Sequence, residues 1–157
     1  MGYTVDKATI QDCLELAPKM RDSDKREIWS SGRYTPSSGL YESLEVSKEH
    51  SYSLKLDGEV VGIFGVAPCG EDTNVGIVWL MGSDNLTKYK KGFYKVSQKY
   101  LKTFLELYKT VFNYVDERNI SSSKWLESLG FKNLHREPKF GKDKIPFNLY
   151  VKERENV

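Results

Sequence analysis

The sequence predicts an α/β domain in which helices flank a mixed, mostly antiparallel central sheet. Three features indicate this class. Runs that alternate apolar and polar residues, typical of strands, are separated by runs with apolar residues three or four apart, typical of helices. Asp57 and Gly58, between two alternating runs, predict an antiparallel hairpin. An almost continuous apolar run at 75–81 predicts a strand that is buried on both faces.

The beginning of the chain predicts a short strand followed by helices. Residues 3–8 alternate in polarity, which predicts the strand. Thr9 and Asp12 have the spacing of a weak capping box, so a helix is expected to begin after Thr9. Pro18 breaks or kinks that helix, and a second helical piece is expected within 22–34.

The next segment predicts a loop, a helix and the hairpin. Residues 30–39, SSGRYTPSSG, form the clearest irregular segment because glycine, proline and serine cluster there. Looser helical spacing follows within 40–46. Residues 52–56 and 60–66 then predict the two strands of the hairpin.

The second half predicts a long helix between core strands. The helix is expected from about residue 87 to 109, with apolar residues on one side and lysines on the other. Residues 110–116 predict a fourth core strand, and 121–129 predict a short helix closed by Gly130. The tail, 131–153, predicts two last strands joined by a glycine-containing loop.

Composition restricts the class of protein. The chain has 157 residues, of which 39% are hydrophobic and 29% are charged. This length fits a single domain over 1–157 that can bury a core without disulfides or metals. The mean hydropathy of −0.56 and the lack of an apolar run near 18–20 residues predict no membrane span. Basic residues outnumber acidic ones by only 24 to 22, so no dedicated nucleic-acid-binding domain is indicated.

Cysteine and histidine usage predicts no metal site. Cys13 and Cys69 lie in no zinc-binding spacing, and His50 and His135 are isolated. Two free thiols and the lack of a signal-peptide pattern favour a cytoplasmic protein with reduced cysteines.

The order of elements resembles the GNAT N-acetyltransferase fold. The segment VFNYVDERNISSSKWLESLGF is similar to the family's strand, Asn, helix and Gly-Phe turn; Asn119 matches the Asn and 129–131 match the turn. With VWLMGSDN and the lysine-rich helix, it more narrowly resembles small GNAT-like phage proteins related to an internal virion protein of short-tailed phages. The resemblance covers 60–135 by local signals and 1–59 by the order of elements.

The resemblance implies a splayed central strand pair and acetyl-CoA as the cofactor. In the family, pantetheine hydrogen-bonds the free strand edge, and the pyrophosphate rests on N–H groups at the start of the next helix, a natural anion site. The matching positions here are Ile77, Val78, Trp79 and Leu80 for the edge and Lys88, Lys90, Lys91 and Gly92 for the phosphates. Asn119 is expected either to contact the cofactor or to cap the short helix.

The sequence departs from the family at the phosphate loop and at the catalytic acid. The usual loop is Arg/Gln-x-x-Gly-x-Gly/Ala. With Gly92 as its first glycine, Tyr94 stands at the second small position; with Gly92 as its last, Lys90 stands where the first glycine belongs. The family's tyrosine on the short helix is replaced by Leu126, which leaves Tyr114 and Tyr94 as possible substitutes.

Three carboxylates near the central strand are candidates for the general base that the family uses. Glu71 and Asp72 precede the strand and Asp84 follows it. A carboxylate can accept a proton from an ammonium group if its geometry and pKa suit the reaction. The alternative for Glu71 and Asp72 is a solvated turn, because turns often contain acidic residues.

Two functions of different classes follow. The first is acetyl transfer from acetyl-CoA to a small-molecule or protein amine by direct attack. The second is a catalytically degenerate GNAT-like protein with a structural or host-interaction role in a phage, located in the host cytoplasm or the virion. The lysine face of the long helix favours a solvated surface, and nucleic acid is not expected as a partner.

Overall fold

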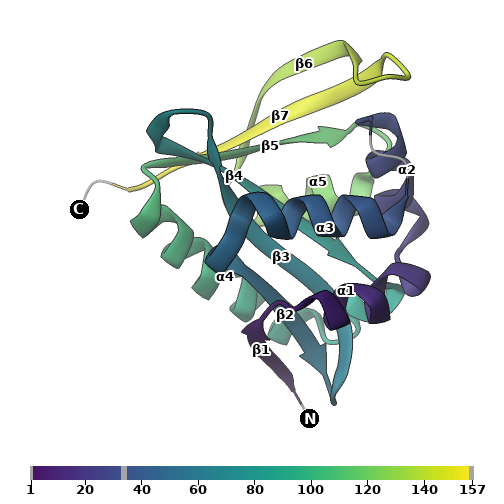
Figure 1. The fold of residues 1–157 in the computed structure, drawn as a ribbon. Coiled ribbons are helices and arrows are strands. Elements are labelled where there is room, and N and C mark those ends of the chain that lie inside the picture. Colours follow the sequence, from purple (N-terminus) through teal and green to yellow (C-terminus); the bar gives the residue numbers. More distant parts are fainter. Residues whose placement is uncertain (1, 33–34, 156–157) are drawn as a thin grey trace.

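A seven-stranded mixed sheet runs through the molecule in the order β1-β2-β3-β4-β5-β7-β6 (Figure 1). The computed structural model describes residues 2–32 and 35–155. Every pair of neighbouring strands is antiparallel except β4 and β5, which are parallel. The strands are β1 (Tyr3–Lys7), β2 (Ser51–Leu56), β3 (Glu59–Cys69), β4 (Asp72–Gly82), β5 (Thr110–Asp116), β6 (Lys132–Phe140) and β7 (Ile145–Glu153).

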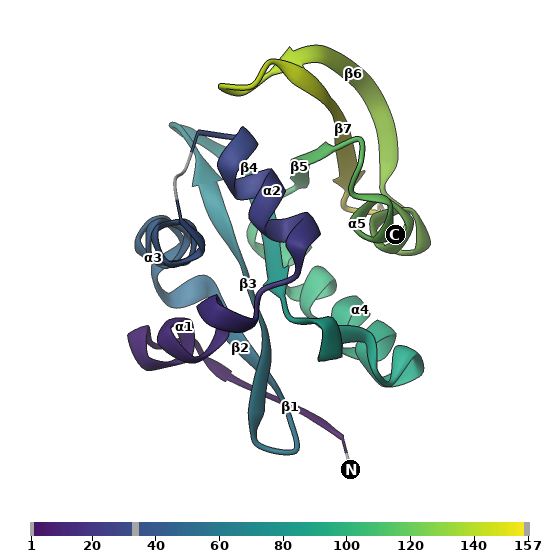
Figure 2. The ribbon, with the colours of Figure 1, turned by 90° about the vertical axis from the view of Figure 1, so that its right-hand side faces the viewer.

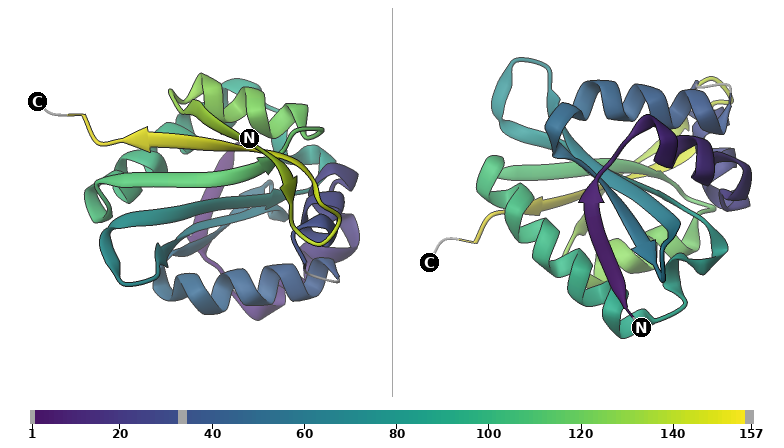
Figure 3. Two further views of the ribbon diagram at one scale, coloured as in Figure 1. Left: turned by 90° about the horizontal axis from the view of Figure 1, so that it is seen from above. Right: turned by 60° about the horizontal axis from the view of Figure 1, so that its bottom comes forward.

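Helices cover both faces of the sheet (Figures 2 and 3). On one side lie α1 (Ile10–Leu16) and α3 (Pro36–Ser47), and on the other lie α4 (Lys90–Leu107) and α5 (Ile120–Ser128). Helix α2 (Asp22–Ser30) lies across the end of the molecule where β4 and β5 separate. Three short 3-10 helices complete the order: η1 (Ala17–Lys19), η2 (Lys48–His50) and η3 (Asp84–Thr87).

Two apolar clusters hold these layers together. One lies between the sheet and α4 and α5, and contains Phe64, Phe93 and Phe104. The other lies between the sheet and α1 to α3, and contains Ile28 and Ile63. Burying this apolar surface is the main stabilising contribution to such a layered fold. Within the described residues, no helix is both long and apolar enough to cross a bilayer.

Two local predictions are confirmed, namely the helix cap at Thr9 and the hairpin turn at Asp57 and Gly58. The side chain of Thr9 accepts a hydrogen bond from the Asp12 N–H, and the Asp12 carboxylate accepts one from the Thr9 N–H. Asp57 and Gly58 have φ values of 51° and 86°, which are the left-handed values that a two-residue hairpin turn requires. These features depend on neighbouring residues only, so the sequence was sufficient to predict them.

Two predictions about the elements were wrong. Segment 30–39 is not irregular throughout, because α3 begins at Pro36. Thr35 and Ser38 form a capping box there, and proline occupies the first turn of the helix. Residues 33–34 lie outside the described ones. Strand β4 is not buried on both faces: Ile77 and Leu80 are half-buried. The strand with a continuous buried run is β3.

Candidate functional site

Strands β4 and β5 run side by side for three residue pairs and then separate. The pairs are Val75 with Thr110, Gly76 with Val111 and Ile77 with Phe112. Beyond Ile77, β4 continues to Gly82 while β5 continues to Asp116, and the two diverge toward α2 (Figure 1). The splayed central strand pair expected from the resemblance is therefore present.

The end of the free β4 edge is capped by residues at the start of α2. The N–H of Gly82 donates to Asp24 Oδ2 at 2.9 Å, and the C=O of Gly82 accepts from the Arg21 N–H at 2.8 Å. Peptide groups alternate in direction along a strand, so Val78 and Leu80 also direct their N–H and C=O groups into the gap. By the same alternation, the peptide groups of predicted edge residues Ile77 and Trp79 face β3.

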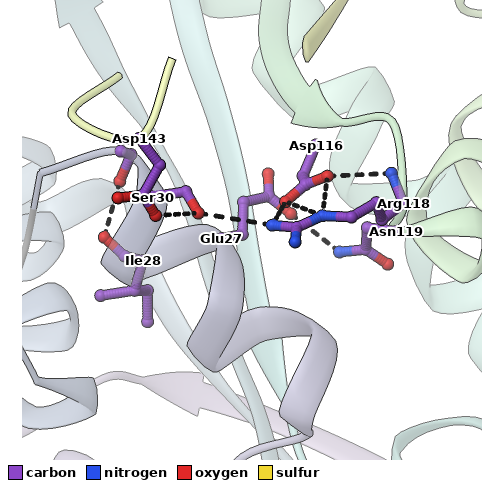
Figure 4. Close-up of polar contacts among 8 residues, drawn as sticks. Glu27, Ile28, Ser30, Asp116, Arg118, Asn119 and Asp143 are labelled. Atoms are coloured by element: carbon purple, nitrogen blue, oxygen red, sulfur yellow. Dashed lines mark hydrogen bonds and ion pairs between the residues drawn. The ribbon is translucent and has the colours of Figure 1, made fainter. Parts of the chain in front are cut away.

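Helix α2 carries Glu27 to this gap. Glu27 Oε2 accepts a hydrogen bond of 2.8 Å from Asn119 Nδ2, and Figure 4 shows the two side chains beside the Asp116–Arg118 pair. Asn119 Oδ1 accepts from the Ser122 N–H at 3.3 Å. Asn119 therefore caps α5, as one of its two sequence-based interpretations predicted, and it also orients Glu27.

The surroundings of Glu27 change its protonation. Burial raises its pKa from 4.5 to about 8; the hydrogen bond from Asn119 opposes the rise, and the negative charges of Asp24 and Asp116 add to it. Within the described part of the chain no cation pairs with Glu27. The two neighbouring carboxylates are paired: Asp24 with Arg21 at 2.9 Å, and Asp116 with Arg118 at 2.7 Å.

A cavity of about 260 Å³ lies on the α2 and α3 side of the gap. Glu27 lies in its wall, together with Trp79 from β4 and Tyr114 from β5. The indole N–H of Trp79 donates to Ser47 Oγ at 2.7 Å, and the ring of Tyr114 stacks on Phe140 with centroids 4.8 Å apart. Tyr114, one of the two hydroxyls suggested from the sequence as a substitute acid, thus lines the same cavity as Glu27.

The opposite side of the gap is filled by aromatic side chains that join α4 to α5. Trp125 stacks on Phe93 with centroids 5.8 Å apart, and its indole N–H donates to Ser97 Oγ at 3.0 Å. The Tyr94 hydroxyl donates to the Ser128 carbonyl at 3.1 Å. The spaces left here and in the gap itself measure about 40 and 30 Å³, which is enough for one or two water molecules each.

The predicted phosphate residues lie at the start of α4. Lys88, Lys90 and Lys91 are exposed there, and the first N–H groups of a helix lack intrahelical partners. Gly92 lies against Tyr3: a Cβ added at Gly92 would be 3.1 Å from that ring. The Tyr3 hydroxyl in turn accepts a hydrogen bond from the Tyr89 N–H at 3.1 Å.

The three carboxylates proposed from the sequence as the base lie apart from this site. Glu71 is exposed in the turn before β4, Asp72 is exposed as the first residue of β4, and Asp84 is exposed in η3 after the strand. The eleven-residue strand β4 lies between Glu71 and Asp84, and it is about 33 Å long. Glu27 had no sequence signal of its own, because it belongs to a polar helix that is far from the central strands in the sequence.

Comparison with known proteins places the chain in a phage family. A family model described as "Bacteriophage T7, probable scaffold protein Gp13" matches residues 53–137, which is more than half of the chain. The chain belongs to this Gp13 family. The phage resemblance seen in the sequence is thereby confirmed. No curated protein matches the sequence.

Solved structures similar to this Gp13 family member are GNAT acetyltransferases. A GNAT acetyltransferase from Bacillus anthracis is 12% identical with a TM-score of 0.73, over 98% of this chain and 95% of that one. AAC(6')-Ib in complex with ribostamycin and coenzyme A is 17% identical with a TM-score of 0.70, over 98% and 94%. Salmonella typhimurium yncA with acetyl-CoA is 12% identical with a TM-score of 0.66, over 100% and 97%. At these identities the likeness shows the GNAT fold.

Proposed function

We propose that this protein transfers an acetyl group from acetyl-CoA to an amine. The observation that carries the proposal is the separation of β4 from β5, with the Glu27 carboxylate facing the gap from α2. A free strand edge and a carboxylate that has no cation partner among the described residues lie at the same place. The solved neighbours with coenzyme A or acetyl-CoA support acetyl-CoA as the cofactor.

The residues present fit part of this cofactor directly. The peptide groups of Val78 and Leu80 would hold the pantetheine arm along the strand edge, which is the edge proposed from the sequence. Lys88, Lys90 and Lys91 would neutralise the phosphates at the start of α4. Asn119, the other proposed contact, uses both ends of its amide on Ser122 and Glu27, so we assign it to positioning Glu27.

Space for the cofactor requires Trp125 to move. The gap holds about 30 Å³ while Trp125 stacks on Phe93, and an extended thioester arm needs several times that volume. We therefore propose that binding displaces the Trp125 ring from Phe93 and breaks its hydrogen bond to Ser97.

Glu27 is the residue we propose as the general base, in place of Glu71, Asp72 and Asp84. An amine bound in the cavity arrives as an ammonium ion, and Glu27 would take its proton so that the neutral nitrogen can attack. A base with a pKa of about 8 suits this proton transfer near neutral pH. Acetyl-CoA, when bound, supplies the acetyl group as an activated thioester.

A second function is favoured by the family and by the filled gap. The Gp13 family description names a scaffold protein. Trp125 lines the narrow gap and stacks on Phe93, and Leu126 stands where the resemblance implies a tyrosine. We propose as the alternative that the fold is retained for a role in phage assembly, with the aromatic stack as a permanent part of its core.

Calorimetry with acetyl-CoA on the wild type and Trp125→Ala separates the two functions. Acetyl transfer predicts saturable binding to the wild type and tighter binding to Trp125→Ala, because no ring has to be displaced. Trp29→Ala, which removes an exposed tryptophan on α2, is the matched control and should bind as the wild type does. If neither the wild type nor Trp125→Ala binds at millimolar concentration, acetyl transfer is wrong and the assembly role remains.

A further inference from the structure

The cavity beside Glu27 has the size of a small molecule. Its volume of about 260 Å³ corresponds to about nine water molecules at roughly 30 Å³ each. It lies on the face of the sheet opposite α4, whose first turn holds the proposed phosphate site. The cavity is therefore available to a second ligand, which in an acetyl transfer is the acceptor.

When Glu27 is ionised, the charge of the cavity fits a single cation. Glu27 is its one carboxylate without a cationic partner among the described residues. Asp24 also lines the cavity, but Arg21 forms two hydrogen bonds with it, at 2.9 and 3.1 Å. A ligand with several ammonium groups would find no second unpaired carboxylate in the part of the wall that the structure describes.

Most of the remaining wall is apolar and aromatic, and Ser31, Ser43 and Asn113 add polar groups to it. Rings from four elements surround the space, namely Trp79, Phe112, Tyr114, Phe140 and Phe147. The indole N–H of Trp79 already donates to Ser47, so the Trp79 ring has no free hydrogen-bond donor for a ligand. Aromatic faces attract both rings and ammonium groups.

The size of the cavity is set by the tip of the β6–β7 hairpin, which is fastened to the end of α2. The Lys142 N–H donates to the Ser30 carbonyl at 3.0 Å. Ser30 Oγ donates to Asp143 Oδ2 at 3.1 Å (Figure 4). Phe140, next to this tip, is held by it over the cavity. A branched acceptor would meet the Phe140 ring on this side of the cavity.

We infer that the acceptor is a small primary monoamine with an apolar, preferably aromatic body. This rests on the proposed acetyl transfer. The ammonium group would pair with Glu27, and the body would lie between Trp79 and Tyr114. Glu27 would take one proton from the ammonium group, and the neutral nitrogen would then form the new bond to the acetyl carbon. As the carbon–sulfur bond of the thioester breaks, the second proton of the nitrogen would pass to the departing thiolate.

Binding of four probes, measured by calorimetry without cofactor at pH 9, where Glu27 is ionised, tests this inference. The probes are 2-phenylethylamine, 2-phenylethanol (the same body without the ammonium), spermidine (a polycation) and an acetylated, amidated lysine. We expect 2-phenylethylamine to bind most tightly. Glu27→Gln should weaken the binding of 2-phenylethylamine at least about tenfold, because the ammonium group of the probe loses its charged partner. Glu45→Gln, an exposed change, should leave this binding unchanged. Thermal melts verify that each variant is folded.

The outcomes distinguish this inference from the proposed function. If 2-phenylethylamine binds in a Glu27-dependent way but no acetyl transfer occurs with acetyl-CoA, the acceptor site stands and the transferase function fails. If spermidine or the lysine probe is acetylated while 2-phenylethylamine neither binds nor reacts, the function stands and this inference is overturned. Equal binding of 2-phenylethylamine and 2-phenylethanol also overturns it, because the ammonium would then contribute nothing.

Discussion

Asn119 donates a hydrogen bond of 2.8 Å to Glu27, a residue 92 positions earlier in the chain. The bond joins the cap of α5 to the middle of α2 at the place where β4 and β5 separate (Figure 4). One amide side chain thus stabilises a helix terminus through its oxygen and positions a carboxylate through its nitrogen. The local stability of α5 and the orientation of Glu27 are coupled through this residue.

Two substitutions of Asn119 should separate its two roles. Asn119→Ser keeps a capping oxygen and removes the donor to Glu27, whereas Asn119→Ala removes both. We expect Asn119→Ala to be less stable than Asn119→Ser by about 1 kcal/mol, the usual contribution of a cap. We expect both to lower acetyl transfer to a similar extent. Urea unfolding and initial rates measure the two effects. Equal stability of the two variants would contradict the capping role.

Glu27 should make the protein less stable as the pH rises. In the unfolded chain this carboxyl ionises near pH 4.5, whereas in the folded protein its pKa is about 8. Between these values the folded state binds more protons, so the free energy of unfolding falls with rising pH, by at most about 1.4 kcal/mol per unit from this group. It should level off above pH 8.

Glu27→Gln is the variant that tests this pH dependence. It should reduce the slope between pH 5 and pH 8, and it should be more stable than the wild type at pH 9, where the ionised carboxylate is most unfavourable. Glu45→Gln, an exposed change on α3, should keep the wild-type slope. Urea unfolding at several pH values provides the measurement. An unchanged slope in Glu27→Gln would mean that Glu27 is not buried in a protonated form.

The proposed acetyl transfer should increase with pH through the ionisation of Glu27. As the base must be unprotonated, kcat/KM for the acceptor should rise up to and somewhat above pH 8, with an inflection close to the pKa of Glu27. Glu27→Gln should lose that inflection together with most of the rate. Glu71→Gln and Asp84→Asn should retain both. If Glu71→Gln or Asp84→Asn loses the inflection and Glu27→Gln keeps it, the residue changed in that variant is the base.

Gly141 should be far less tolerant of a side chain than Gly58. Both have positive φ, at 70° and 86°, so alanine at either position carries a similar backbone cost of roughly 1–2 kcal/mol. At Gly58 no atom of the described residues lies within 4 Å of the new Cβ, whereas at Gly141 the new Cβ would overlap the Ser30 carbonyl oxygen in the present backbone.

The difference between Gly141→Ala and Gly58→Ala therefore measures the attachment of the hairpin tip to α2. We expect Gly141→Ala to be the less stable variant by at least about 1 kcal/mol, as measured by urea unfolding. It should also admit larger amines to the cavity, because Phe140 is released. Similar stability of the two alanine variants would show that the tip moves freely away from Ser30.

Much of the fold could be predicted from the sequence because its signals are local. The capping box at Thr9, the turn at Asp57 and Gly58 and the strand Thr110–Asp116 each depend on residues within a few positions of one another. The parting of β4 and β5 was also expected, through the resemblance to the GNAT family. The burial of β4 was not predicted correctly, because an apolar run does not reveal that a neighbouring strand departs halfway along it.

The candidate site could be predicted only in part. The lysines at the start of α4 and the edge residues Val78 and Leu80 follow from their own segments, whereas the peptide groups of Ile77 and Trp79, also predicted for the edge, face β3. Glu27 is different: in the sequence it is one of many charged residues in a polar helix. Its altered pKa arises only because α2 packs across the open end of the sheet, where Asp24, Asp116 and Asn119 surround it. Burial and through-space charge depend on distances that chain positions alone do not specify, so tertiary packing selected this carboxylate.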